Sequence, residues 1–251
     1  MSRGMLKNIF LAMIGLFVLY AANSIEAFGP IKIYINICVA LLIVWSIFRD
    51  YVLKYISAAG AYMCSACDTQ KGIDVLNSKR KLAFFPKARK QTFILDCYAA
   101  LDQGDEKKFQ EFIDANSQNY LLKDKGCSLT FEYVLLLFFF FTGEYDKFNS
   151  AYKRITDVDT SKKRGIKLDE SVKNVLDIAS LITKKKYGDA TKAINKTELK
   201  ALNKRNKAYF YLMQAVMHSD SKDSSALKHD KSILEKENIK IPFINNTVAK
   251  L

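Results

Sequence analysis

The sequence lacks the motifs that most enzyme classes require. It has no P-loop, no glycine-rich dinucleotide motif and no His-Glu-x-x-His zinc motif. It has two histidines, His218 and His229, and neither has a serine, cysteine or carboxylate at a recognisable catalytic spacing. We therefore predict that the protein is not an enzyme and holds neither a cofactor nor a metal.

Proline and glycine are also scarce, with three and ten residues among 251. No segment after Arg49 shows the alternating pattern of a β-strand, and apolar residues instead recur at helical spacing. These features predict an all-α fold.

The cysteines do not form the regular pattern of a disulfide framework. There are five, an odd number, and their spacing is irregular: Cys38, Cys64, Cys67, Cys97 and Cys127. This pattern is typical of a reducing compartment. Cys64 and Cys67 form a C-x-x-C, but no strand precedes it as in thioredoxins, and no second ligand pair accompanies it as in zinc sites. The two thiols therefore have two interpretations, a redox, metal or palmitoylation site and simple packing.

Acidic residues are outnumbered, 26 against 39 lysines and arginines, so the net charge is +13. Such basicity is typical of proteins that bind nucleic acid, an anionic membrane or an acidic protein partner. No nucleic-acid-binding motif accompanies the charge, so we do not expect a nucleic-acid partner. Apolar residues concentrate before Arg49 and charge concentrates after it, which favours the inner leaflet of a membrane.

Two apolar segments, about residues 6–25 and 31–48, each approach the roughly 20 residues that span a bilayer core. The connection, residues 23–30, contains Gly29-Pro30 and little charge, as a short loop between two helices should. Positive charge precedes the first segment and follows the second, at Arg3, Lys7, Arg49 and Lys54. The positive-inside rule then places both termini in the cytoplasm.

A cleaved signal peptide is the competing interpretation of the first segment, with residues 9–19 as its hydrophobic region. The residues that follow, Tyr20 to Asn23, make a poor cleavage site. Even after cleavage, the second segment would stop transfer and leave the rest of the chain in the cytoplasm. A third apolar run, residues 133–141, is too short to span and predicts a buried helix.

Three similar turns divide the chain after Arg49 into helix pairs. They are Gly104-Asp105, Gly143-Glu144 and Gly188-Asp189. In each, glycine suits the left-handed residue that closes a helix, and the acid favours the start of the next helix. Asp68 is expected to cap an earlier helix in the same way.

These turns resemble those of tetratricopeptide repeats, stacked helix pairs that bind other proteins. Gly143-Glu144-Tyr145 and Gly188-Asp189 with Ala193 carry the resemblance, which covers about residues 51–237. The turns are irregularly spaced and further apart than the family's period of about 34 residues. The resemblance implies a stack of antiparallel helix pairs at 50–238, after a transmembrane hairpin at 1–49 and before a C-terminal tail at 239–251. An irregular helical bundle is the alternative for the soluble part.

One segment concentrates cations around two aromatic residues. We expect it to contact anionic lipid or a partner through Lys79, Arg80, Lys81, Phe84, Phe85, Lys87, Arg89 and Lys90. The alternative is a solvated connection in which Phe84 and Phe85 pack into the next helix pair.

Together these features predict a multi-pass protein of the cell membrane whose soluble domain is a cytoplasmic scaffold or adaptor. Its groove would bind another protein, with Tyr145, Tyr187, Tyr209 and Tyr211 as candidate lining residues. One alternative is an accessory subunit of a membrane complex that acts through polar and small residues of its hairpin, namely Gly15, Asn36, Ala40 and Ser46. Another is a thiol- or zinc-dependent sensor built on Cys64 and Cys67.

Overall fold

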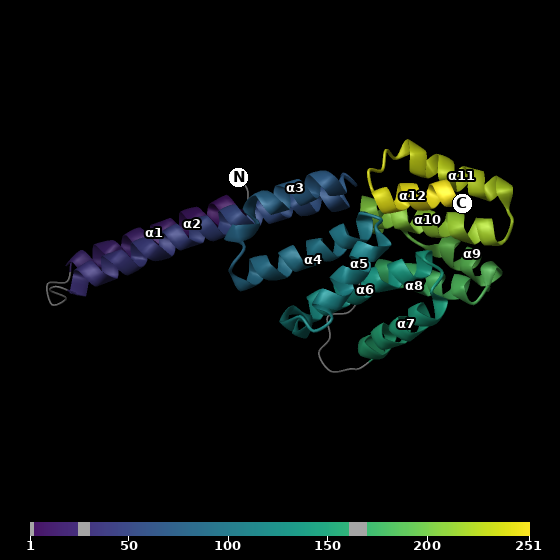
Figure 1. The fold of residues 1–251 in the computed structure, drawn as a ribbon. Coiled ribbons are helices and arrows are strands. Elements are labelled where there is room, and N and C mark those ends of the chain that lie inside the picture. Colours follow the sequence, from purple (N-terminus) through teal and green to yellow (C-terminus); the bar gives the residue numbers. More distant parts are fainter. Residues whose placement is uncertain (1–2, 25–30, 161–169) are drawn as a thin grey trace. The chain divides into compact units, whose positions relative to one another are not determined.

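The computed structural model of the chain describes residues 3–24, 31–160 and 170–251 (Figure 1). Within these ranges it leaves out the side chains of 3–9, 11–12, 22–23 and 157–160. Most of the predicted loop at 23–30 lies outside the described residues. The chain divides into two compact units, Met1–Ser57 and Ala58–Leu251.

The first unit consists of two long helices, α1 (Arg3–Ser24) and most of α2 (Ile31–Cys64). Among the described residues, α2 is the one helix that is long and apolar enough to cross a membrane. The predicted apolar helix at the second segment is thus confirmed, although it continues well past Phe48 and supplies the first turns of the second unit. The two helices touch at Gly15, where an added Cβ would lie 2.8 Å from Ile43 Cδ1.

All regular elements of the second unit within the described ranges are helices. One isolated β-bridge, between Asp68 and Lys240, is present among the described residues. The all-α prediction is confirmed. Several consecutive helices pack against each other, most extensively α6 with α7, α8 with α9 and α10 with α11. The α-helices after α2 are α3 (Thr69–Lys79), α4 (Pro86–Asp102), α5 (Glu106–Asn116), α6 (Lys125–Phe141), α7 (Tyr145–Thr160), α8 (Glu170–Thr183), α9 (Tyr187–Lys196), α10 (Lys204–Asp220), α11 (Ser224–Lys236) and α12 (Pro242–Lys250). Short 3-10 helices are η2 (Arg80–Leu82), η3 (Tyr120–Lys123) and η4 (Leu199–Ala201).

Aspartate side chains begin several of these helices. Asp68 accepts a hydrogen bond from the Lys71 N–H at the start of α3, and Asp105 accepts one from the Lys108 N–H at the start of α5. Each bond satisfies a backbone donor that has no partner inside the helix. Gly104, just before Asp105, has φ +72°, the left-handed conformation expected of it.

The three glycine turns are not equivalent in the structure. Gly143 has φ +75°, like Gly104, but Gly188 does not close a helix and lies inside the first turn of α9. Lys185 takes the left-handed position instead, with φ +58°, and the next N–H, of Lys186, bonds the Leu181 carbonyl to close α8. The prediction for Gly188 was therefore wrong, because α8 ends three residues earlier than the glycine pattern indicated.

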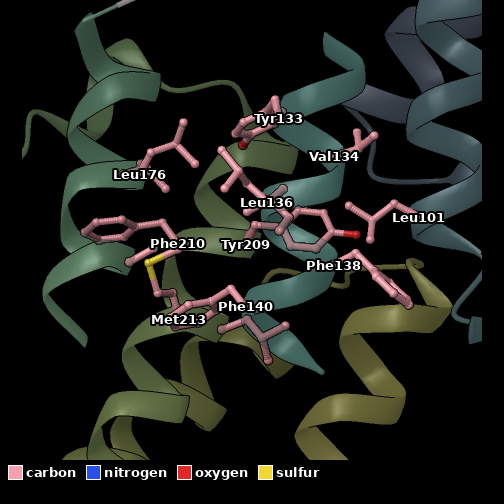
Figure 2. Close-up of a cluster of buried hydrophobic side chains, with 14 of the residues drawn as sticks. Leu101, Tyr133, Val134, Leu136, Phe138, Phe140, Leu176, Tyr209, Phe210 and Met213 are labelled. Carbon is pink, nitrogen blue, oxygen red and sulfur yellow. The ribbon is translucent and has the colours of Figure 1, made fainter. Parts of the chain in front are cut away.

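The core of the second unit centres on α6, whose run of apolar residues is buried as predicted. Figure 2 shows Val134, Leu136, Phe138 and Phe140 of α6 among side chains from other helices. Phe109 on α5 packs against this helix, with its ring centroid 4.4 Å from that of Phe138 and the two rings tilted.

Helix α10 lies across the faces of several earlier helices. Tyr209 on α10 hydrogen-bonds Asp102 on α4, and its ring is 5.9 Å from that of Phe141 on α6. Asn206, one turn earlier, accepts a hydrogen bond from the hydroxyl of Tyr133 on α6 (3.3 Å), and α10 also packs on α8. The inner face of α4, α6 and α8 is therefore covered by the chain itself.

The C-terminal tail also packs onto the second unit. Ile241 and Ile244 are fully buried, and the ring of Phe243 lies 5.8 Å from that of Phe141. The Lys240 N–H bonds the Cys67 carbonyl at 2.9 Å. Residues 239–251 therefore complete the helical unit.

Candidate functional site

The basic aromatic segment occupies the connection between α3 and α4. The chain leaves α3 at Lys79, makes the 3-10 turn η2 and enters α4 at Pro86. Proline suits the first position of a helix, where its missing N–H costs no bond, and it favours an extended residue before it. Phe85 is extended accordingly, with φ −87° and ψ 153°.

Three of the predicted contact residues are tied to the rest of the fold, although Arg80 is exposed and Lys90 is half-buried. Arg80 makes a two-pronged ion pair with Asp96 (Nη1–Oδ2 2.9 Å, Nη2–Oδ1 2.6 Å), and this hydrogen bonding raises the pKa of Arg80. Lys90 binds Asp124 (Nζ–Oδ2 2.5 Å), and Phe85 is buried. These three side chains hold the connection in place.

Most of the other predicted contact residues are exposed to solvent. Lys81, Phe84, Lys87 and Arg89 are exposed, and Lys79 is half-buried. Phe84 is 49% exposed, while its neighbours Ala83 and Phe85 are buried. The connection is therefore anchored at Ala83 and Phe85 and presents Phe84 between cations.

The structure adds a second segment that sequence reasoning missed. Residues 119–125, at η3 and the start of α6, lie beside the first turns of α4. The hydroxyl of Tyr120 accepts a hydrogen bond from Arg89 (3.4 Å), and the Cys127 thiol lies 3.8 Å from the Lys90 carbonyl. An aromatic residue in a polar connection, as at Phe84, was the one available signal in the sequence.

The most buried polar group is an ion pair between two helices far apart in the sequence. Arg205 on α10 and Asp102 on α4 are both essentially inaccessible to solvent and lie 2.7 Å apart (Nη2–Oδ1). The hydroxyls of Tyr209 (2.6 Å) and Thr69 (3.0 Å) complete the carboxylate's shell. The Arg205 guanidinium also lies over the ring of Tyr98, 4.3 Å from its centroid.

The burial of this ion pair indicates a structural role. The Arg205 Nη1 atom is buried and has no hydrogen-bond partner among the described residues. Desolvation is the largest single effect and would lower the pKa of Arg205, but Asp102 together with Tyr209 and Tyr133 outweighs it and holds the pKa well above its usual value. Since the ion pair is sealed from solvent, it serves to join α3, α4 and α10.

The two cysteines of the C-x-x-C occupy a turn at the end of α2. Cys67 is fully buried and has φ +52°. Burial raises the pKa of its thiol to about 11, so the thiolate, the reactive form, is scarce at neutral pH. Within the described residues, no three His, Cys, Asp or Glu side chains gather as metal ligands. This environment favours the packing interpretation of Cys67.

One histidine has a partner that sequence spacing did not indicate. His218 Nδ1 lies 2.7 Å from Asp230 Oδ2, which joins the end of α10 to α11. Burial raises the pKa of the Asp230 carboxyl, and the hydrogen bond with His218 opposes that shift. Among the described contacts of this pair no nucleophilic side chain appears, so we interpret it as a link between two helices.

The four candidate groove tyrosines do not line one groove. Tyr209 is fully buried (Figure 2). Tyr211 lies on the same helix, and burial, together with the nearby charges of Glu237 and Asp230, raises the pKa of its hydroxyl. Tyr145 and Tyr187 are half-buried and share the neighbourhood of Asp220. Comparison with family models, with curated proteins and with solved structures finds no match to this chain.

Proposed function

We propose that the protein is a membrane-anchored helical adaptor. In this proposal α1 and α2 form a transmembrane hairpin, and the tetratricopeptide-like second unit binds another protein at the cytoplasmic face. The observation that carries the anchoring is the distribution of exposed apolar side chains. All but two of the large exposed hydrophobic residues in the described part of the chain lie between Phe10 and Tyr51.

That apolar surface is unsuited to water. It includes Phe17 (72% exposed), Leu42 (67% exposed) and Val44 (63% exposed), and a soluble domain rarely exposes contiguous apolar patches beyond a few hundred Å². In a membrane, lipid acyl chains would cover the same side chains and keep them out of water. The charges around the two helices support an orientation with both termini in the cytoplasm.

The polar residues of α2 support the same assignment. Asn36, Val39, Ile43 and Ser46 recur at helical spacing, and Val39 and Ile43 meet Gly15 of α1. The polar side chains therefore share the face that contacts α1, away from the apolar surface.

Those polar residues also favour a second candidate function, the accessory subunit. The Asn36 Oδ1 and Ser46 Oγ atoms are buried and have no hydrogen-bond partner among the described residues. Such groups can hydrogen-bond another helix inside a bilayer once the helices rearrange. A partner would then be recognised within the membrane.

For the adaptor, a groove on the second unit offers a place for a partner. Because α10 covers the inner face of α4, α6 and α8, we place recognition in the open groove of about 470 Å³ between α3, α4 and α5. Ala99 and Ala100 form part of its lining, and the Arg80–Asp96 ion pair also borders it. Small residues on the lining leave room for the side chains of an extended segment.

Affinity purification of the full-length protein in mild detergent, followed by mass spectrometry, tests the proposal. Ala100→Glu, which places a charge in the groove, should lose the partner that the wild type retains. Ala226→Glu, on α11 outside the groove, is the matched control and should retain it.

Two other results of this experiment would contradict the adaptor function. If the wild type retains no specific partner, adaptor function is contradicted. If Ala100→Glu retains the partner and Asn36→Leu loses it, recognition lies in the membrane and the accessory-subunit function stands instead.

A further inference from the structure

Two exposed aromatic residues stand out on the second unit. Phe84 (49% exposed) and Tyr120 (59% exposed) are the two large apolar side chains of its described part that are exposed to this degree. They come from connections 36 positions apart in the sequence. Contacts between α4 and the start of α6 bring these connections to the same end of the unit.

The contacts that join the two connections are specific. Arg89 on the first turn of α4 hydrogen-bonds the Tyr120 hydroxyl, and Lys90 binds Asp124 at the start of α6. Tyr120 is thus held beside the first turn of α4, which directly follows Phe84 and Phe85 in the chain.

The charges around the two aromatic residues are predominantly positive. Lys81, Lys87, Arg89 and Lys123 are exposed, and residues 79–90 contain no acidic side chain. The nearby carboxylates, Asp96 and Asp124, are already bound to Arg80 and Lys90. Positive charge therefore remains at the surface.

This surface lies at the end of the second unit where the chain enters it. Gly72 on α3 meets Ala59 and Met63 of α2, so α3 runs back along the last turns of α2. An added Cβ on Gly60 would lie 3.5 Å from Leu95, halfway along α4. The end of α3 and the start of α4 therefore lie towards Ala58, the first residue of the unit.

We propose that this surface, formed by Lys81, Phe84, Lys87, Arg89, Tyr120 and Lys123, binds the headgroup layer of an anionic membrane. Lysine and arginine attract acidic headgroups, and aromatic rings favour the interface between headgroups and acyl chains. The inference rests on the membrane location in the proposed function, but it does not depend on any protein partner.

Vesicle binding in trans tests this contact apart from anchoring and partner recruitment. Full-length protein held in a non-ionic amphipol is mixed with vesicles of phosphatidylcholine, with or without added phosphatidylserine, and bound protein is measured by flotation. Binding should increase with phosphatidylserine. The double variant Lys81→Gln/Lys87→Gln should weaken it by about fivefold for each charge removed, and Phe84→Ser should weaken it further.

The matched control is Lys222→Gln/Lys228→Gln, which removes one exposed lysine in the turn after α10 and one on α11. It changes the net charge by the same amount and should leave binding near the wild-type level. Equal binding to neutral and anionic vesicles would overturn the proposal, as would equal losses in the two double variants. A wild type that binds anionic vesicles as expected but retains no specific protein partner would contradict only the adaptor function.

Discussion

At the scale of single residues, the ion pair between Asp102 and Arg205 has the largest consequence for stability. Burying two charges is unfavourable unless each is paired and hydrogen-bonded, and here the carboxylate receives bonds from Arg205, Tyr209 and Thr69. Removal of one partner leaves the other charge buried without compensation.

We therefore expect Arg205→Met to lower the free energy of unfolding by about 3–5 kcal/mol. Arg154→Met is the matched control, because Arg154 pairs with Glu132 at 3.0 Å and is 58% exposed; it should cost less than about 1 kcal/mol. Denaturant unfolding in detergent, followed by circular dichroism, measures both. Similar losses in the two variants would show that the buried ion pair has no special role.

This ion pair was not predictable from the sequence. Asp102 and Arg205 are 103 positions apart, and each resembles an ordinary polar residue near a helix end. Their pairing depends on how α10 packs across α4, which no local pattern records. The Phe84 segment was found because its cations and aromatic residues are consecutive, whereas Tyr120 joins it only through tertiary contacts.

At the scale of elements, the turn at Gly104 supports the C-terminal helix. An added Cβ on Gly104 would lie 3.0 Å from the backbone of Phe243, whereas the same atom on Gly143 would meet nothing within 4 Å. Both glycines are left-handed. An alanine at Gly143 would therefore meet backbone strain alone, whereas an alanine at Gly104 would meet the same strain and a steric conflict with Phe243.

Gly143→Ala should cost about 1 kcal/mol, the usual strain of a left-handed alanine. Gly104→Ala should cost more, because the new methyl group also displaces α12. Limited proteolysis should then cut residues 239–251 faster in Gly104→Ala than in Gly143→Ala. Equal cleavage of the two variants would show that α12 does not depend on this turn.

The cap of α6 gives a prediction about pH. Hydrogen bonds from Lys90 and from the Cys127 N–H lower the pKa of the Asp124 carboxyl. The carboxylate therefore stabilises the fold above the ordinary carboxyl pKa of about 3.9, and this stabilisation is lost as the pH falls through the lower folded-state pKa.

Asp124→Ala should accordingly lower stability by about 1 kcal/mol at neutral pH, and the difference from the wild type should shrink at acidic pH. Asp114→Ala, an exposed aspartate within α5, is the control and should show little difference at any pH. Melting temperatures across a pH series measure the effect. A difference that persists in acid would contradict the assigned role of the charge.

Local chemistry explains why some elements were predictable. The turns at Gly104 and Gly143 were predictable because each consists of a glycine followed directly by an acidic residue. Each of these residues acts through its own backbone or side chain. The third turn differs because a lysine, Lys185, adopts the left-handed conformation without any sequence signal. The course of α10 across three earlier helices was unpredictable for the same reason as its ion pair.

At the scale of the whole molecule, an apolar pair of helices precedes a basic helical unit in the chain. The sequence indicated both parts through composition, since apolar residues concentrate before Arg49 and charge after it. Helix α2 belongs to both parts, because the helix continues past its apolar stretch, through Arg49, Asp50 and Lys54, into the second unit. We propose that α1 and α2 cross the membrane and leave the second unit in the cytoplasm.

Cysteine accessibility in intact cells tests this membrane topology. Ala27→Cys, between the two apolar segments, and Ser225→Cys, on α11, are each labelled with a membrane-impermeant maleimide, and labelling is measured above that of the wild type. We expect Ala27→Cys to react in intact cells and Ser225→Cys to react only after lysis. Labelling of Ser225→Cys in intact cells, or release of the protein from membranes by alkaline carbonate, would contradict it.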